Sequence, residues 1–198
     1  MAPVRISERI VDVVFRVWSG FYDAPFLQDT FYRRVHAVVL REVAGLAPRA
    51  VVDLGCGTAL LTADLRARFP SARVVVGVDL SQGMLREGLR RHDALVRANV
   101  YALPIAGGAV DLLTSTISYH FYVEPERALA EIRRVLAPGA TLVLATMVTR
   151  FLKGSTGIMR LTTIGETQRH LEQAGFSVER IGRVRPGVAV FVAKATRA

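Results

Sequence analysis

The chain has 198 residues, 51 % of them hydrophobic and 22 % charged, a balance that excludes a disordered protein and indicates one globular domain. No apolar run reaches the ~20 residues of a membrane span, and the first residues lack the pattern of a secretory signal, so we expect a cytoplasmic protein. The single cysteine, Cys56, excludes an internal disulfide and fits a reducing compartment.

The net charge of +9 comes almost entirely from arginine, because only Lys153 and Lys194 among the 26 basic residues are lysines. The arginines are spread along the chain, with no block of like charges and no basic stretch interleaved with aromatics. This pattern favours an arginine-rich solvated surface and no nucleic-acid partner. A patch that recruits acidic partners, lipid headgroups or RNA is the alternative.

The first 45 residues are predicted to form two amphipathic helices, over 4–18 and about 26–45, with a break at Ser19-Gly20. Both precede the first predicted strand and stand outside the pattern that follows, so we expect an N-terminal helical cap over the site. The first helix carries arginines on its polar side, so a helix lying on a membrane surface is the alternative.

From residue 50 onward, predicted strands and helices alternate, which is typical of right-handed crossovers and of a parallel sheet covered on both faces. The strands are expected at 50–54, 73–78, 94–98, 110–116 and 140–147, and the helices at 58–68, 81–91 and 125–136. The fold class is therefore α/β, with a doubly wound and mostly parallel sheet.

The last fifty residues are predicted to complete the sheet. Thr163 and Glu166 form a capping box that begins a further helix, and Gly175 ends it. Two closing strands, 176–184 and 187–195, are joined by so tight a turn that they form an antiparallel hairpin. The sequence thus predicts seven strands in one sheet.

The segment VVDLGCGTALLT at 51–62 indicates a buried strand, a tight glycine turn and a helix that starts at Thr58. Gly55 and Gly57 let a ligand approach the bare backbone, and the helix N-terminus favours an anionic group. Asp79 ends the next apolar strand, where a carboxylate can accept hydrogen bonds from both hydroxyls of a ribose. Together these features predict a nucleoside ligand.

The spacing of this motif narrows the ligand. The dinucleotide fingerprint G-x-G-x-x-G fails, because Leu60 occupies the third glycine position. The motif D-L-G-C-G-T at 53–58, followed by Asp79, instead resembles that of the class I S-adenosylmethionine-dependent methyltransferases. Further segments resemble that family in the same order, at 80–91, 102–121 and 125–147. The resemblance is nearest to the ubiquinone/menaquinone-biosynthesis branch.

This resemblance implies a Rossmann-like fold and one methyltransferase domain over 1–198 that uses S-adenosylmethionine. Its parts would be the cap at 1–45, a cofactor-binding core at 48–147, and a C-terminal helix and hairpin at 148–198. The residues expected to hold the cofactor are Asp53, Gly55, Cys56, Gly57, Thr58, Asp79, Leu80, Met84, Asn99, Val100 and Thr116.

Several of these residues have an alternative role. Asp53 is expected at the methionyl end of the cofactor, or it fixes the glycine loop by accepting backbone N–H bonds. Asp79 is expected on the ribose, with capping of the helix at Ser81 as the alternative. Met84 either presses on the adenine or belongs to the core.

The chain departs from the family pattern at two positions. Asn99 stands where the family usually has an aspartate that accepts from the adenine amino group, and Asn can still accept through its side-chain oxygen. Val100 is expected to offer its backbone N–H to the ring edge. Ala59 replaces the third glycine of the family's loop, which adds one methyl group there.

Methyl transfer requires alignment of the reactants, and a base only if the acceptor must lose a proton. Ser118, Tyr119 and His120 follow the fourth predicted strand, and His120 is the best candidate base, because an imidazole titrates near neutral pH. Its alternative role is to order its own loop. Tyr22, in the predicted cap, is expected to close over the cofactor.

Absent motifs narrow the acceptor. The motif of enzymes that methylate nucleobase amino groups is missing at 115–118, and Cys56 in the glycine loop cannot serve cytosine C5 methylation. No cluster of His, Cys and acids has metal-ligand spacing, so we expect no metal. Phe21, Tyr119, Phe121 and Tyr122 could line an apolar pocket. We therefore expect transfer to carbon or oxygen of a small, apolar or aromatic acceptor, with a homodimer as one possible assembly.

Two other functions stay open at this point. The departures at Asn99 and Ala59 would also suit a protein that binds S-adenosylmethionine without transferring its methyl group. The net charge of +9 would suit a basic RNA-modifying protein.

Overall fold

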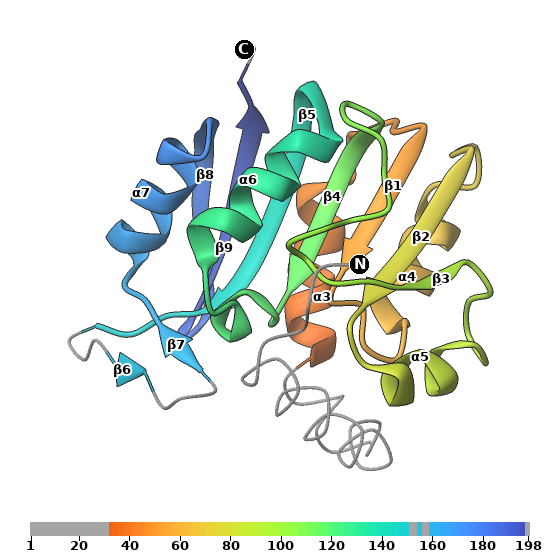
Figure 1. Cartoon of the computed structure of the whole chain (residues 1–198), viewed down its shortest axis with the longest axis horizontal. Coiled ribbons are helices and arrows are strands. Elements are labelled where there is room, and N and C mark those ends of the chain that lie inside the picture. Colours follow the sequence, from red (N-terminus) through yellow and green to blue (C-terminus); the bar gives the residue numbers. More distant parts are fainter. Residues whose placement is uncertain (1–31, 151–153, 156–158, 197–198) are drawn as a thin grey trace.

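The computed structural model describes residues 32–150, 154–155 and 159–196, and its core is a seven-stranded sheet with helices on both faces (Figure 1). In spatial order the strands are β3 (Leu95–Arg97), β2 (Val74–Asp79), β1 (Ala50–Leu54), β4 (Val110–Thr116), β5 (Leu136–Met147), β9 (Val188–Ala195) and β8 (Phe176–Arg185). All neighbours pair in parallel except β9, which is antiparallel to β5 and β8. A separate short sheet pairs β6 (Gly154–Ser155) with β7 (Arg160–Leu161).

The helices pack against the two faces of this sheet. They are α3 (Arg33–Glu42), α4 (Leu60–Arg68), α5 (Gln82–Gly88), α6 (Pro125–Val135) and α7 (Ile164–Gln173), with a 3-10 turn at Tyr119–Phe121. One buried cluster joins α6 and α7 to the sheet, and a second joins α3 and α4 to it. Leu112 and Leu113 of β4 belong to opposite clusters, because successive strand residues point to opposite faces.

The order of the strands creates a crevice at one edge of the sheet. The chain runs outward from β1 through β2 to β3, then returns to place β4 and β5 on the other side of β1. The connections therefore leave the carboxyl ends of β1 and β4 in opposite directions. Ligands of open α/β sheets bind at such a switch point.

The predicted seven-stranded sheet and its C-terminal hairpin are confirmed, with shifts at some ends. β5 begins at Leu136 instead of 140, because Leu136 already pairs with Val110 before the register shifts. The capping box is also confirmed, since Thr163 Oγ1 accepts from Glu166 N and the Glu166 carboxylate accepts from Thr163 N. Gly175 ends α7 with a φ of 82°.

Of the predicted cap, the structure describes only α3. Val35 and Val39 on this helix are fully buried in the cluster that also contains Leu65 of α4 and Val143 of β5. α3 thus covers a sheet face, and none of its residues lines the cavity described below, whereas the sequence predicted a cap over the site. The first predicted helix lies outside the described residues. In the described part of the chain, no helix is long and apolar enough to cross a membrane.

Candidate active site

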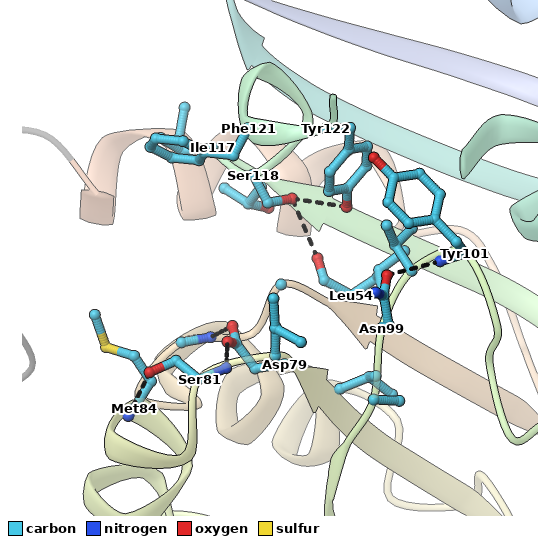
Figure 2. A pocket seen from close by; sticks show the side chains of 17 residues that line it. Leu54, Asp79, Ser81, Met84, Asn99, Tyr101, Ile117, Ser118, Phe121 and Tyr122 are labelled. Carbon is cyan, nitrogen blue, oxygen red and sulfur yellow. Dashed lines mark hydrogen bonds between the residues drawn. The ribbon is translucent and has the colours of Figure 1, made fainter. Parts of the chain in front are cut away.

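A cavity lies at the carboxyl ends of β1, β2 and β4 (Figure 2). About 860 Å³ of its space is not filled by atoms, part of it open to solvent. Its walls are formed by Leu54, Gly55, Gly57, Val78, Asp79, Leu80, Ser81, Met84, Ala98, Asn99, Val100, Tyr101, Thr116, Ile117, Ser118, Phe121 and Tyr122. Eight of the predicted cofactor residues are in this list, from Gly55 to Thr116.

The glycine loop after β1 is held by the end of β2. Gly55 N and Cys56 N both donate to Val78 O, at 2.7 and 3.1 Å. Gly55 has a φ of 71°, and a Cβ at this position would lie 2.5 Å from Ser118 Cβ. Gly55 is therefore required twice, by its backbone conformation and by the close approach of the segment after β4.

Asp79 is the carboxylate of the cavity wall. Its Oδ2 accepts from Gly57 N at 2.9 Å, and its Oδ1 accepts from Ser81 N at 2.8 Å. These bonds orient the carboxylate between the glycine loop and the start of α5. Ser81, and not Asp79, caps α5 by accepting from Met84 N, while the ribose contact expected of Asp79 stays a prediction.

Three predicted cofactor residues do not line the cavity. Thr58 is buried, and α4 begins only at Leu60, because Ala59 before it has a left-handed φ of 61°. Cys56 points toward β2, where a Cβ on Gly77 would lie 2.9 Å from its Sγ. The sequence motif placed these residues in the loop correctly, but their side chains do not face the cavity.

Asp53 is the third of these, and it lies beneath the loop. Its two carboxylate oxygens accept from Thr62 Oγ1 at 2.7 Å and from Thr114 Oγ1 at 2.8 Å. It therefore ties β1 to α4 and β4 through hydroxyls, not through the backbone N–H groups considered above. Burial raises the pKa of Asp53 to about 6, despite the two hydroxyl donors.

The expected adenine side of the cavity contains Leu80, Met84, Asn99 and Val100. Met84 is 2 % exposed, so it is both a core residue and part of the wall. Asn99 Oδ1 accepts from Tyr101 N at 3.1 Å, which is an Asx turn. The oxygen expected on a nucleobase amino group thus already accepts a backbone hydrogen bond.

The opposite wall follows β4 and is rich in hydroxyl groups. Ser118 Oγ lies 2.7 Å from Ser115 Oγ and 3.2 Å from Tyr122 OH, and Ser115 Oγ also contacts Tyr122 OH. Burial raises the pKa of Tyr122 to about 12, so this phenol stays protonated. Thr116 Oγ1 is buried and has no hydrogen-bond partner among the described residues.

Ile117, between these hydroxyls, has a φ of 53°. A β-branched residue in the left-handed region is a genuine outlier, and such strain tends to occur at functional sites. The bond from Ile117 N to Ala145 O, at 2.8 Å, fixes this conformation. Ile117 and Tyr101 were not predicted, although both closely follow strands that end at this edge.

The candidate base His120 does not line the cavity. It is 2 % exposed, lies against Phe121, and its Nδ1 has no hydrogen-bond partner in the described part of the chain. Burial lowers the pKa of His120 to about 4, so it is neutral near pH 7 and a weak base. The position after β4 was predicted correctly, but the 3-10 turn directs this side chain inward. Tyr22 lies outside the described residues.

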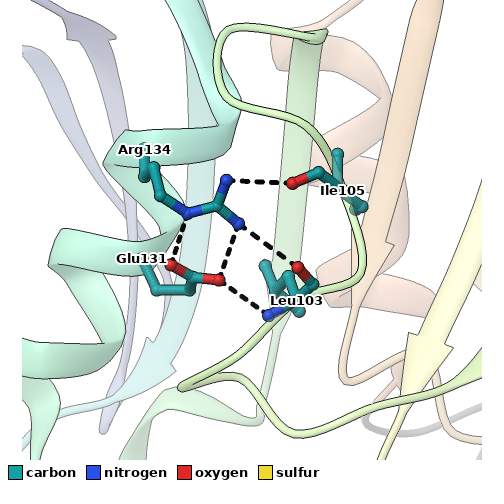
Figure 3. A network of polar contacts seen from close by, with 4 residues as sticks. All are labelled: Leu103, Ile105, Glu131 and Arg134. Atoms are coloured by element: carbon teal, nitrogen blue, oxygen red, sulfur yellow. Dashed lines mark hydrogen bonds and ion pairs between the residues drawn. The ribbon is translucent and has the colours of Figure 1, made fainter.

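A polar clamp holds the loop that carries Asn99 and Tyr101 (Figure 3). The Arg134 guanidinium donates to Ile105 O at 2.9 Å and Leu103 O at 3.2 Å, and it pairs with Glu131 at 2.6 Å. The Glu131 carboxylate accepts from Leu103 N at 2.7 Å, and the hydrogen bond from Arg134 lowers the pKa of Glu131. The clamp thus joins this cavity wall to α6.

Removing the clamp should loosen that loop. We expect Arg134→Met to lower the free energy of unfolding by about 1 kcal/mol, because two carbonyls and a carboxylate lose their donor. Amide hydrogen exchange over residues 101–108 should accelerate as well. Arg90→Met is the matched control, since Arg90 is an exposed arginine that pairs only with Glu87 in the described structure. Equal effects of the two changes would contradict the clamp.

The requirement for glycine at position 55 has two parts: the strain of a left-handed backbone, and the steric overlap of a Cβ atom with Ser118. Gly108 has nearly the same φ, 68° against 71°, but a Cβ there would meet nothing within 4 Å. Gly108→Ala should therefore cost only the left-handed penalty, about 1–2 kcal/mol. Gly55→Ala should cost roughly 1–3 kcal/mol more from overlap with Ser118. Urea unfolding measures both, and Ser118→Gly should restore part of the Gly55→Ala loss; identical losses at the two glycines would refute the close approach.

The pKa of Asp53 predicts a pH dependence. The native state holds the Asp53 proton up to about pH 6, whereas the unfolded chain releases it near 3.8. Stability from this group is therefore greatest below pH 4 and falls as the pH rises to 6, by about 3 kcal/mol in all. Asp53→Asn should lack this decline, so the difference in stability between wild type and the variant should contain it. Thr114→Val should move it to higher pH, because one donor to the carboxylate is lost.

Comparisons with known proteins agree with this geometry. A family model described as a methyltransferase domain matches residues 52–144. Malonyl-[acyl-carrier protein] O-methyltransferase of Hahella chejuensis is 37 % identical over 109 residues, which cover 53 % of this chain and 39 % of that protein. Demethylmenaquinone methyltransferase of Thermus thermophilus is 38 % identical over 104 residues, 50 % of this chain and 47 % of that protein. The chain spans about half the length or less of these two relatives.

A solved structure extends the likeness to most of the fold. The SAM dependent methyltransferase from Aquifex aeolicus has a TM-score of 0.75 at 20 % identity, over 91 % of this chain and 98 % of that one. At this identity the likeness concerns the fold alone. Residues 52–144 thus match a methyltransferase domain, and the sequence matches, the strand order and the cavity beside the glycine loop all agree with the resemblance to the class I S-adenosylmethionine-dependent methyltransferases.

Proposed function

We propose that this chain transfers a methyl group from S-adenosylmethionine to carbon or oxygen of a small acceptor molecule. The observation that carries the proposal is the position of Asp79, which faces the same cavity as the bare backbone of Gly55 and Gly57. An acid at the end of β2 and a glycine turn at the end of β1 suit the two ends of an adenosine moiety that bears an amino-acid tail.

The residues of the cavity fit this cofactor. Gly55 and Gly57 present bare backbone to the cavity, and Asp79 offers its carboxylate next to Gly57. The apolar walls from Leu80 and Met84 suit the face of an adenine ring. Thr116 Oγ1, buried without a partner among the described residues, suits a polar group of the ligand.

The bound cofactor would supply an electrophilic methyl group on a sulfonium. The chain's own contribution is to hold the acceptor in line with that methyl group and to exclude water. Ser118 and Tyr122 could donate hydrogen bonds to an acceptor oxygen, since the Tyr122 phenol stays protonated. His120 is given no base role, because it is buried away from the cavity. Closure by Tyr22 stays a prediction.

The acceptor class follows from the wall nearest to β4. Ile117 and Phe121 give it an apolar surface next to the hydroxyls, which suits a small apolar or aromatic molecule with one oxygen or an activated carbon. The relatives' names give two acceptors, a malonyl group on an acyl-carrier protein that is methylated at oxygen, and demethylmenaquinone. The proposal keeps both oxygen and carbon as the methylated atom, and a homodimer stays a prediction.

The test is calorimetric binding of S-adenosylhomocysteine to Asp79→Ala. We expect the affinity to fall roughly 100-fold or more, because two charge-assisted hydrogen bonds to the ribose are lost. Asp93→Ala is the control, since Asp93 is an exposed acid that does not line the cavity. Unchanged affinity in Asp79→Ala would rule out the ribose contact.

Measurements of methyl consumption, cofactor binding and RNA binding on the same protein distinguish the three candidate functions. Methyl consumption with a small acceptor supports the transferase. Tight S-adenosylhomocysteine binding without methyl consumption on any acceptor would favour a cofactor-binding protein instead. Salt-sensitive binding of RNA would favour the RNA-modifying alternative.

A further inference from the structure

A second hollow opens at the same edge of the sheet, between the end of β5, the start of α7 and the turn from β8 to β9. About 1190 Å³ of its space is not filled by atoms, part of it open to solvent. Three arginines line it: Arg150 after β5, and Arg183 and Arg185 at the end of β8. Two chain segments far apart in sequence thus bring three guanidinium groups to one concave place.

The charge of this hollow is one-sided. Among its described lining residues there is no Asp or Glu. Arg169 adds a further cation at the rim, since its Nη1 lies 3.8 Å from the Cβ position of the lining residue Gly165. The carboxylate of Glu166, in the helix cap of α7, accepts from Thr163 N at 3.0 Å, and Glu166 is not among the residues that line the hollow. The hollow is therefore more positive than an evenly arginine-rich surface would make it.

The hollow and the active-site cavity are neighbours along the sheet. Thr116, at the cavity, pairs with Ala145 of β5, and Val148 follows β5 and lines the hollow. Val148 N donates to Gly187 O at 2.8 Å, which fixes the β8–β9 turn beside it. β4 and β9 are separated by β5 alone, so roughly 10 Å of extended ligand would reach from one site to the other.

We propose that the methyl acceptor bears an anionic group, a phosphate or a carboxylate, at the end of an extended arm, and that Arg150, Arg183 and Arg185 bind this group. This inference rests on the proposed methyl transfer and refines its acceptor, which becomes apolar near the methyl group and anionic at its far end. Guanidinium groups match both anions with paired, charge-assisted hydrogen bonds. Several cations around one concave site bind an anion more strongly than a single exposed ion pair would.

The experiment uses three probes with the same eight-carbon arm: octyl phosphate, nonanoate and the uncharged octanol. Ligand-detected NMR measures their affinities for the full chain loaded with S-adenosylhomocysteine. We expect the anions to bind at least about 10-fold more tightly than octanol. The stronger of the two anions identifies phosphate or carboxylate as the group that the hollow accepts.

In the double variant Arg183→Gln/Arg185→Gln, the anions should bind less than about 3-fold more tightly than octanol, because two of the three cations are removed. Arg73→Gln is the matched control: it removes the same kind of exposed charge before β2, at the opposite edge of the sheet, and should keep the full advantage. Both variants should keep the wild-type melting temperature.

Three results would overturn the proposal: no anionic preference in wild type, no binding of any probe, or a preference that survives in the double variant. Binding of S-adenosylhomocysteine is measured in the same samples. Wild type that binds neither this product nor the probes would contradict the proposed function itself. Wild type that binds the product but shows no anionic preference would contradict only the acceptor assigned here.

Discussion

The site depends on one contact between neighbouring strands: the turn after β1 is hydrogen-bonded to the end of β2. Gly55 N and Cys56 N share Val78 O, and Gly57 N binds the Asp79 carboxylate. Parallel pairing of β1 with β2 places these groups level with each other, so the sheet register sets the loop's position. Asp79 thus faces the cavity and also fixes the glycine loop that forms part of its wall. The shape of the cavity therefore depends on the pairing of the strands.

Patterns with a local physical cause could be predicted from the sequence. The alternation of strands and helices, the capping box at Thr163 and the strand-end position of Asp79 each depend on nearby residues or on a regular period. The direction of side chains in irregular segments could not be predicted from the sequence. Asp53, Thr58 and His120 lie within the expected segments, but contacts with Thr62, Thr114 and the 3-10 turn decide where they point. The contact with Thr114 comes from a residue 61 positions along the chain from Asp53, which no local pattern reveals.

Two kinds of electrostatic environment coexist at this edge of the sheet. In the segment after β4, burial favours neutral forms: the pKa of His120 falls to about 4, that of Tyr122 rises to about 12, and both groups are uncharged near pH 7. Around the hollow, exposed guanidinium groups keep full charge in solvent. An apolar reaction zone beside a cationic anchor would hold an amphipathic molecule in one orientation, because only one of its ends suits each region.

The left-handed conformation of Ile117 limits how far the stability of the protein can be raised without loss of function. Replacing Ile117 with glycine would relieve the strain of its left-handed backbone. The Ile117 side chain, however, forms part of the cavity wall, and its N–H joins β4 to β5. Thermostabilisation at this position would therefore proceed at the expense of activity, which is the trade-off expected where a strained residue serves a site.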